Sequence, residues 1–204
     1  SRGPGFVYKS QGGHSPPNDL NDLYSFTTAT RKWRKLVAAD APSPRRTMGF
    51  SAGAGGLLVT YGLASVAPYV PRDAHFFDVA AQAWRALPAP PEEGGLVQSS
   101  FRYGHGQAVL NGTAFVFGGH GYPDYRNDLL TLKLGDAAAQ WAAVAAQGDV
   151  PAGRYGGALA AVGQQLLLYG GRKYIYTSNG GWVWYSDLTL FDPSTGCLLY
   201  TSPS

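Results

Sequence analysis

The sequence has little cysteine, little charge and no long apolar run. Cys197 is the only cysteine, so an internal disulfide framework is excluded and a reducing, cytoplasmic compartment is favoured. No window reaches the roughly 18 apolar residues of a membrane-spanning helix, so no membrane span is expected. The chain starts at Ser1 without a basic-then-apolar leader. No targeting segment is therefore visible, and we expect the true N-terminus to lie outside this sequence.

Glycine, proline and aromatic residues are plentiful by contrast. The 204 residues include 28 glycines and 14 prolines, and 13% are aromatic. The glycines and prolines are scattered between short apolar runs rather than concentrated in one tract. This distribution is typical of an all-β domain with many turns and not of a disordered chain.

The net charge of +3 comes from dispersed basic residues, with one small cluster at Arg31, Lys32, Arg34 and Lys35. One interpretation is a patch for nucleic acid or another anionic surface. The other is a solvated strand and turn around Trp33. Nothing elsewhere in the sequence extends the patch, so we favour the second interpretation and expect no nucleic-acid partner.

An internal repeat is the most informative feature of the sequence. A glycine pair, or a close variant of it, occurs four times at spacings of 49, 57 and 52 residues. The segment GGHSPPNDLND, which begins at Gly12, closely matches GGHGYPDYRND, which begins at Gly118. The four positions are Gly12-Gly13, Tyr61-Gly62, Gly118-Gly119 and Gly170-Gly171.

Three further markers accompany these pairs in a fixed order. An arginine lies 16 residues before the pair, an aspartate and an apolar strand follow it, and a tryptophan comes 11 to 13 residues after the aspartate. Each unit therefore predicts four short strands, A to D, with the arginine before A, the pair after B and the tryptophan on D. The markers are Arg45, Arg102 and Arg154; Asp22, Asp73, Asp128 and Asp187; and Trp33, Trp84 and Trp141.

A four-stranded sheet of this kind cannot cover its own faces, whereas radial stacking of copies can. The period near 50, the glycine pair and the downstream tryptophan resemble the kelch family of β-propellers. The resemblance implies an all-β, kelch-type β-propeller with four-stranded antiparallel blades. Because kelch propellers usually close with six or seven blades, we expect a fragment of about four. Residues 1–196 form it, in units at about 1–37, 45–87, 102–144 and 154–196.

Two positions depart from the simple pattern. Tyr61 replaces the first glycine of its pair, so we expect the B–C turn of the second unit to differ from the others. Asn111-Gly112-Thr113 fits the glycosylation sequon, but Asn-Gly between apolar runs is also a tight hairpin turn. We favour the hairpin.

The repeat fails at the end of the chain. Asp187 predicts a tryptophan at position 198, but the sequence there is CLLYTSPS. This octapeptide resembles the translation of a transposase-type sequencing adapter. We therefore interpret Cys197–Ser204 as a non-native tail; the alternative is a divergent strand D.

No constellation of residues indicates catalysis. The four histidines are His14, His75, His105 and His120, and two of these occupy equivalent repeat positions. We interpret them as histidines of the repeat rather than metal ligands. Copper radical oxidases resembling galactose oxidase need a tyrosine cross-linked to a cysteine, which this sequence does not offer outside the tail. We expect no cofactor and no metal.

The face that carries the B–C loops and D–A connections is the expected binding surface. Tyr, Trp and Arg are enriched in binding hot spots, and long loops on a rigid scaffold often carry function. The leading arginines should ring the mouth of a central channel there, although they could instead bond neighbouring-blade carbonyls. Loop aromatics could likewise only pack their own loop. The candidate residues are Arg45, Arg102, Arg154, Tyr122, Tyr125, Arg126, Lys173, Tyr174, Tyr176 and Trp182, and 172–184 is the longest loop.

The expected function is that of a non-catalytic kelch interaction module, a scaffold or adaptor for a protein or peptide partner. An acidic partner is expected if the arginines are exposed. The alternative is a fragment of a propeller enzyme, either a galactose-oxidase-like copper oxidase or a sugar-acting enzyme, with its site in further blades.

Overall fold

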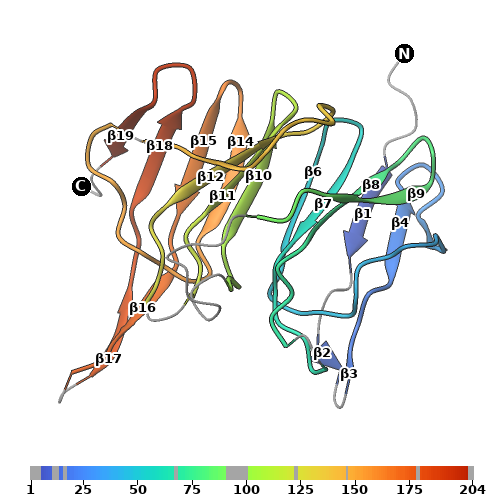
Figure 1. Cartoon of the computed structure of the whole chain (residues 1–204), viewed down its shortest axis with the longest axis horizontal. Coiled ribbons are helices and arrows are strands. Elements are labelled where there is room, and N and C mark those ends of the chain that lie inside the picture. Colours follow the sequence, from blue (N-terminus) through green and yellow to red (C-terminus); the bar gives the residue numbers. More distant parts are fainter. Residues whose placement is uncertain are drawn as a thin grey trace.

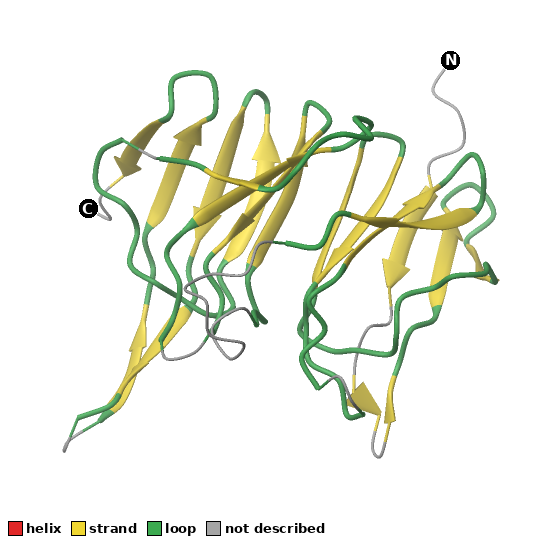
Figure 2. Ribbon diagram, in the orientation of Figure 1, coloured by secondary structure: helices red, strands yellow, loops and turns green. Residues whose placement is uncertain are grey.

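A computed structural model describes residues 6–10, 14–15, 18–66, 69–90, 101–121, 124–145, 147–177 and 180–201. For residues 6–10, 14–15 and 199–201 it describes the backbone alone. Every regular element in these ranges is a β-strand (Figure 2). Within them, no helix has the length and apolar character needed to cross a membrane.

Four antiparallel sheets follow one another along the chain, and we call them blades 1 to 4 (Figure 1). Blade 1 contains β1 (Phe6–Ser10), β4 (Leu23–Thr27) and β5 (Lys32–Leu36). Blade 2 contains β6 (Gly49–Gly53), β7 (Gly56–Thr60), β8 (Ala74–Asp78) and β9 (Ala83–Leu87). Blade 3 contains β10 (Gly106–Leu110), β11 (Thr113–Phe117), β12 (Leu129–Lys133) and β13 (Ala142–Ala143). Blade 4 contains β14 (Ala158–Val162), β15 (Gln165–Tyr169), β18 (Leu188–Asp192) and β19 (Cys197–Thr201).

Two small hairpins extend from the same end of the sheets (Figure 1). They are β2 (His14–Ser15) with β3 (Asn18–Asp19), and β16 (Arg172–Ile175) with β17 (Gly181–Trp184). The second hairpin occupies the segment expected to be the longest loop. The chain is a partial β-propeller with no helix in its described residues, as the repeat predicted.

The strand register repeats from blade to blade. The residue after the marker aspartate pairs with the last residue of strand B in every blade. The pairs are Leu23↔Ser10, Ala74↔Thr60, Leu129↔Phe117 and Leu188↔Tyr169. The marker residues therefore stand at equivalent places in each sheet, and their side chains are directly comparable.

Burial of the B strands follows from the stacking of the blades. Every residue of β7 is buried, since blade 2 has a blade on each side. β15 alternates instead, with Leu166 and Leu168 buried and Tyr169 exposed. A strand covered on one face buries only every second side chain. Blade 4 is thus covered on one face by the described residues.

Two of the three marker tryptophans fill the space between adjacent blades. Trp141 packs among the apolar residues of blades 2 and 3, and its Nε1–H donates to the carbonyl of Pro88 at 2.8 Å. Trp84 packs on the apolar cluster between blades 1 and 2. Trp33, in blade 1, is 53% exposed. Trp84 and Trp141 each face the preceding blade, so both contribute to the packing between blades.

The interface between blades 3 and 4 has Leu198 at the tryptophan position. The apolar cavity there, lined by Leu198, Phe117 and Phe191 among others, measures about 80 Å³. The equivalent recess between blades 1 and 2, where Trp84 stands, measures about 10 Å³. β19 pairs along its whole length with β18. Because backbone pairing tolerates most sequences, the non-native origin of Cys197–Ser204 stays a prediction.

The B–C turn of blade 2 does not differ from the others, contrary to expectation. Tyr61 has φ of 50°, in the same left-handed region as Gly118 and Gly170. The turn keeps its form because the tyrosine ring is buried. The guanidinium carbon of Arg102 lies 5.6 Å from the centroid of that ring. The expected Asn-Gly hairpin is confirmed, since Asn111 and Gly112 both have positive φ and join β10 to β11.

Backbone hydrogen bonds join neighbouring blades at repeated positions. The second residue of a glycine pair donates to the carbonyl of the next leading arginine, from Gly62 to Arg102 and from Gly119 to Arg154. A second series links Gly104 to Thr47 at 2.8 Å and Gly156 to Gly104 at 2.7 Å. These bonds connect blades 2, 3 and 4 into one body.

Candidate partner-binding surface

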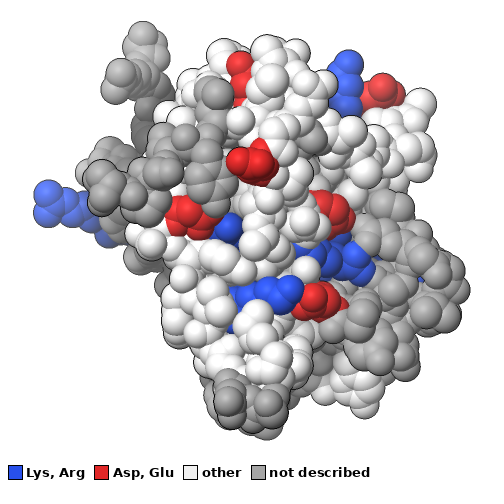
Figure 3. All heavy atoms as spheres, turned by 90° about the vertical axis from the view of Figure 1, so that its left-hand side faces the viewer, with Lys and Arg blue, Asp and Glu red and all other residues white. Residues whose placement is uncertain are grey.

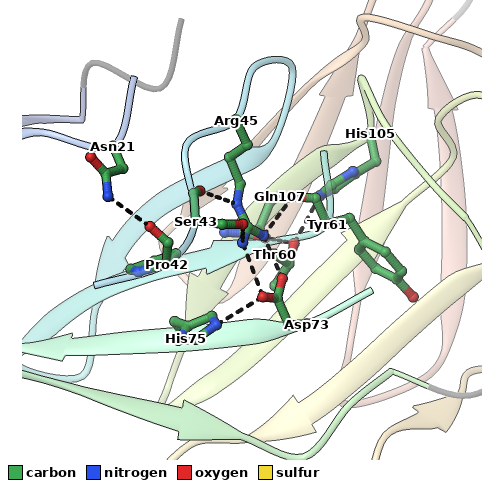
Figure 4. Close-up of polar contacts among 10 residues, drawn as sticks. All are labelled: Asn21, Pro42, Ser43, Arg45, Thr60, Tyr61, Asp73, His75, His105 and Gln107. Carbon is green, nitrogen blue, oxygen red and sulfur yellow. Dashed lines mark hydrogen bonds and ion pairs between the residues drawn. The ribbon is translucent and has the colours of Figure 1, made fainter. Parts of the chain in front are cut away.

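The three leading arginines are buried and do not line a mouth. Arg45, Arg102 and Arg154 are each 1% to 2% exposed. Each guanidinium holds the marker aspartate of its own blade, as Figure 4 shows for Arg45 and Asp73. Each also donates to the first carbonyl of its glycine pair. Since these contacts hold each guanidinium inside its own blade, the prediction that the arginines are exposed at a channel mouth is wrong, and no partner-binding role is assigned to them.

The charge of the arginine stabilises its aspartate in blade 2. Burial raises the pKa of Asp73, but hydrogen bonds from Arg45 and His75 outweigh burial and hold that pKa well below its ordinary value. His75 Nε2 lies 3.0 Å from the carboxylate (Figure 4). His75 therefore contacts the internal ion pair of Arg45 and Asp73.

The residue after each buried arginine is the one that reaches the loop face. Arg46, Tyr103 and Tyr155 form β-bridges to Leu63, His120 and Arg172, respectively. Each bridge joins a D–A connection to the B–C loop of the same blade. The two kinds of loop therefore share one face, as predicted.

Blade 3 contributes a row of aromatic rings to this face. Tyr103 lies 5.0 Å from His120, which lies 4.9 Å from Tyr125 between ring centroids. Phe101 stacks on Tyr103 at 6.4 Å. Burial lowers the pKa of His120, so the imidazole is neutral near pH 7. The row is aromatic and uncharged.

Blade 4 contributes one face of the hairpin β16–β17. Residues on a strand alternate between faces, and directly paired residues share a face. The pairs Arg172↔Trp184 and Tyr174↔Trp182 therefore lie together. Tyr174 contacts the Trp182 ring at 5.2 Å and the Tyr176 ring at 4.9 Å. The hairpin thus presents one almost wholly aromatic face.

Arg172 links the two groups of rings. Its guanidinium lies 4.3 Å from the ring centroid of Trp182, 5.1 Å from that of Trp184 and 5.5 Å from that of Tyr155. Tyr155 in turn contacts Tyr103 at 5.9 Å. Such contacts orient a guanidinium without neutralising it. Within the described residues no carboxylate pairs with Arg172, so its charge is available to an anionic ligand.

Lys173 anchors the other face of the hairpin to blade 3. Its ammonium group lies 2.9 Å from Asp124 and 6.0 Å from the centroid of Tyr125. Burial raises the pKa of Asp124, but the hydrogen bonds from Lys173 and from the Tyr125 amide, with the Lys173 charge, together outweigh burial and lower that pKa overall. Lys173 therefore positions the hairpin, and its charge is already paired.

These rings and Arg172 form one continuous surface, which we call the aromatic loop surface. Its exposed part is the hairpin, where Tyr176 is 71%, Trp184 is 68% and Trp182 is 46% exposed. Figure 3 views the molecule from the end at which blade 4 lies. Charged side chains are few on that view, and acidic groups lie beside basic ones. The surface comprises Phe101, Tyr103, His120, Tyr125, Tyr155, Arg172, Tyr174, Tyr176, Trp182 and Trp184.

The structure brings together five of the predicted site residues and sets others apart. Tyr174, Tyr176 and Trp182 are part of the aromatic loop surface, Tyr125 is its buried base, and Lys173 holds the hairpin. Arg126 is partly buried, with its guanidinium beside Gly121. Tyr122 lies outside the described residues.

Sequence reasoning missed Tyr103 and Tyr155, and it named Arg172 and Trp184 only as the ends of the longest loop, which it expected to contact the partner. The usable signal was alternation: an extended segment that buries Arg102 or Arg154 turns the next residue to the opposite side. The same rule applied to Arg172 to Ile175 and Gly181 to Trp184 groups the rings on one face. The first of these signals requires that the arginine be assigned as buried.

A buried polar network lies at the interface between blades 2 and 3. His105 Nε2 lies 2.9 Å from Thr60 Oγ1, and Gln107 Nε2 donates to Ser51 Oγ at 2.9 Å (Figure 4 shows three of these side chains). Burial, with the Arg102 charge as a smaller cause, lowers the pKa of His105 to about 3. The neutral imidazole is an interface residue. Among the described residues no three His, Cys, Asp or Glu side chains gather as metal ligands would.

Comparison with known proteins agrees with the fold and leaves the family open. No family model matches the chain. The solved structure of YjhT superposes with a TM-score of 0.75 at 15% identity, over 97% of this chain and 68% of that one. The chain is 34% identical over 94 residues to the Rho GTPase-activating protein gacHH of Dictyostelium discoideum. It is 32% identical over 94 residues to Tip elongation aberrant protein 1 of Schizosaccharomyces pombe.

These matches cover small parts of long proteins. They span 46% and 45% of this chain but 6% and 8% of the two relatives. The structural neighbour, at its low identity, shows the fold alone. The class that fold and comparisons define together is the β-propeller.

Proposed function

We propose that the chain is part of a kelch-repeat propeller that acts as a protein-interaction module, a scaffold or adaptor. The aromatic loop surface contacts the partner. The observation that carries the proposal is the exposed aromatic face of β16–β17. Tyrosine and tryptophan immobilised on a hairpin offer large contact areas at a low cost in conformational entropy, and such residues dominate binding hot spots.

The partner is a protein or peptide segment with a carboxylate. Arg172 is held among three rings with its N–H edges unpaired by any described carboxylate. A guanidinium fork in this state favours a carboxylate, which it can bind with two hydrogen bonds. The expected preference for an acidic partner therefore depends on Arg172 and not on the buried arginines. The kelch markers and the partial matches to much longer proteins support the role of a module within a larger chain.

The test is selection of peptides from a displayed random library on the full chain. Peptides that bind should lose at least tenfold in affinity when Trp182 and Trp184 are both changed to serine. The matched control is Trp33→Ser, because Trp33 is similarly exposed but lies on blade 1. Arg172→Gln should weaken binding of acidic peptides more than that of neutral ones. Selected peptides that bind the hairpin variants and the unchanged chain equally would refute the proposal.

A further inference from the structure

The exposed face of the hairpin β16–β17 carries polar groups of one kind. The indole N–H groups of Trp182 and Trp184 and the guanidinium of Arg172 can donate hydrogen bonds but cannot accept them. Within the described residues, none of these three side chains donates a hydrogen bond. Trp141, by contrast, donates its Nε1–H to the carbonyl of Pro88 at 2.8 Å. The face therefore offers unused donors to a ligand.

Aromatic rings surround these donors. Arg172 pairs with Trp184 and Tyr174 pairs with Trp182 across the two strands, so all four side chains share the face. The ring planes of Tyr174 and Trp182 meet at 71°, edge to face. The neighbouring Tyr176 ring is 4.9 Å from that of Tyr174 and is mostly exposed. A ligand can therefore pack apolar rings on this face while its acceptors reach the indole N–H groups.

The hairpin is held in place before a partner binds. Backbone hydrogen bonds of 2.8 and 2.9 Å join Arg172 to Tyr155, and Lys173 lies 2.9 Å from Asp124 on the other face. The hairpin extends from the end of blade 4 and not from the face of its sheet (Figure 1). Its aromatic face is therefore not part of the surface on which blades stack. A surface that is already ordered binds a partner at a low cost in conformational entropy.

We propose that the partner segment is rich in proline, adopts the polyproline II conformation and carries a carboxylate. This inference rests on the proposed function, because it names the occupant of the same aromatic loop surface. Proline has a carbonyl but no N–H, so a proline-rich segment is rich in acceptors and poor in donors. Its pyrrolidine rings pack on the aromatic rings, as in other domains that bind such segments in aromatic-lined grooves. The carboxylate accepts two N–H groups of Arg172.

Other backbone conformations match the donors less well. The carbonyls of an α-helix are bonded within the helix. A β-strand presents as many N–H donors as carbonyl acceptors, and its donors find no acceptor among Arg172, Trp182 and Trp184. A polyproline II helix has no internal hydrogen bonds, so its carbonyls stay free for the indole N–H groups. The donors of the hairpin thus favour the polyproline II segment.

The experiment compares three peptides labelled with a fluorophore and titrated into the full chain. Each carries one aspartate followed by six prolines, six alanines or six sarcosines. Six prolines in polyproline II span about 19 Å. A four-residue strand of the hairpin spans about 13 Å, so the peptide covers the face. We expect the proline peptide to bind at least tenfold more tightly than the alanine peptide. The sarcosine peptide, which lacks N–H groups but is flexible, should bind with intermediate affinity.

Conservative variants test the individual donors. Changing Trp182 and Trp184 together to phenylalanine keeps two aromatic rings but removes both N–H groups, and it should weaken the proline peptide at least fivefold. Trp33→Phe is the matched control, because Trp33 is also exposed but lies on blade 1, and it should have no effect. Arg172→Gln should weaken the proline peptide that carries aspartate and leave a version with asparagine unchanged.

Four outcomes would overturn this inference, and three of them leave the proposed function intact. The first is equal binding of the proline and alanine peptides, with both lost when Trp182 and Trp184 are changed to serine. The second is no binding of the proline peptide while library-selected peptides bind through the hairpin. The third is equal binding of the proline and sarcosine peptides, which would exclude a need for the polyproline II conformation. The fourth is proline-peptide binding that the serine variant does not weaken. In that case the library selection decides the proposed function separately.

Discussion

Arg154 and Asp187 lie 33 residues apart, yet both carboxylate oxygens accept N–H groups of the guanidinium, at 2.7 and 2.9 Å. The same guanidinium donates to the carbonyl of Gly170 at 3.0 Å. The contact joins the start of the inner strand, the glycine pair and the start of strand C. One buried ion pair therefore fixes three segments of the blade, and blades 2 and 3 repeat it.

Breaking this ion pair should strongly destabilise the chain. Arg154→Met leaves the carboxylate of Asp187 buried and unpaired, and we expect the free energy of unfolding to fall by about 3–5 kcal/mol. Urea denaturation measures the change. Adding Asp187→Leu to that variant should restore part of the loss, since no buried charge then remains. Arg34→Met is the exposed control and should cost well under about 1 kcal/mol. A similarly small loss for Arg154→Met would contradict the structural role of the pair.

Filling the cavity between blades 3 and 4 should stabilise the chain. At about 24 cal/mol per Å³, a cavity of this size corresponds to about 2 kcal/mol. Leu198→Trp places an indole where Trp84 and Trp141 stand in other blades, and we expect the free energy of unfolding to rise by about 1–2 kcal/mol. Thermal and urea unfolding both report the change. Destabilisation by Leu198→Trp would show that blade 4 does not share the tryptophan geometry.

The opposite substitution, of tryptophan by leucine in blade 2, also tests whether this side chain fills the space between blades. Trp84→Leu removes the side chain that reduces the equivalent recess to about 10 Å³. We expect a loss of about 3 kcal/mol in the free energy of unfolding, as for other large-to-small changes in a packed interface. Trp33→Leu is the matched control, because Trp33 is more than half exposed, and should have a much smaller effect.

The burial of His105 should make stability depend on pH below 6.5. Its pKa is about 3 when folded and 6.5 ordinarily, so between these values the unfolded chain binds a proton that the folded chain does not. The free energy of unfolding should therefore fall as the pH is lowered from 6.5, by up to about 1.4 kcal/mol per pH unit. Urea denaturation at pH 6.5 to 4.5 measures the slope, above the range where Asp73 contributes. His105→Gln should flatten the slope, and an unchanged slope would place the titrating group elsewhere.

Two glycines with positive φ should differ in their tolerance of alanine. A Cβ at Gly112 would meet no atom within 4 Å, so Gly112→Ala should cost about 1 kcal/mol through backbone strain alone. A Cβ at Gly119 would lie 3.0 Å from the Tyr103 carbonyl and 2.9 Å from the His105 Cβ. Gly119→Ala should cost clearly more, because it also disturbs the inter-blade bond to Arg154. Equal costs in thermal unfolding would show that the contact at Gly119 relaxes freely.

The repeat predicted much of the fold because each marker reports a local requirement. The glycine pairs mark positive φ, the apolar runs mark buried strands, and Asn111-Gly112 marks a tight turn. The prediction of a different B–C turn at Tyr61 is wrong, because a residue with a side chain can take positive φ when burial and a neighbouring guanidinium hold its ring. The sequence alone indicates a positive φ only at positions where the residue is glycine.

The binding surface was harder to predict than the fold. The prediction that the leading arginines line a channel mouth is wrong. The aspartates that bind them lie 26 to 33 residues away in the sequence, and only the folded sheet brings each pair together. The segment Arg172–Trp184 was recognised as important but not as a hairpin. Its aromatic and β-branched residues favour strand pairing, yet the partner of each strand is fixed by register, which the composition does not reveal.

Two backbone bonds between blades can report the order in which the blades separate. The amide of Gly104 donates to the carbonyl of Thr47 across the interface between blades 2 and 3. The amide of Gly156 donates to the carbonyl of Gly104 across the interface between blades 3 and 4. Hydrogen exchange at Gly104 reports separation of blade 2 from blade 3, and exchange at Gly156 reports separation of blade 3 from blade 4. Equal protection at the two amides would mark cooperative melting of the whole arc. Faster exchange at Gly156 would mark fraying that begins at the interface with the 80 Å³ cavity.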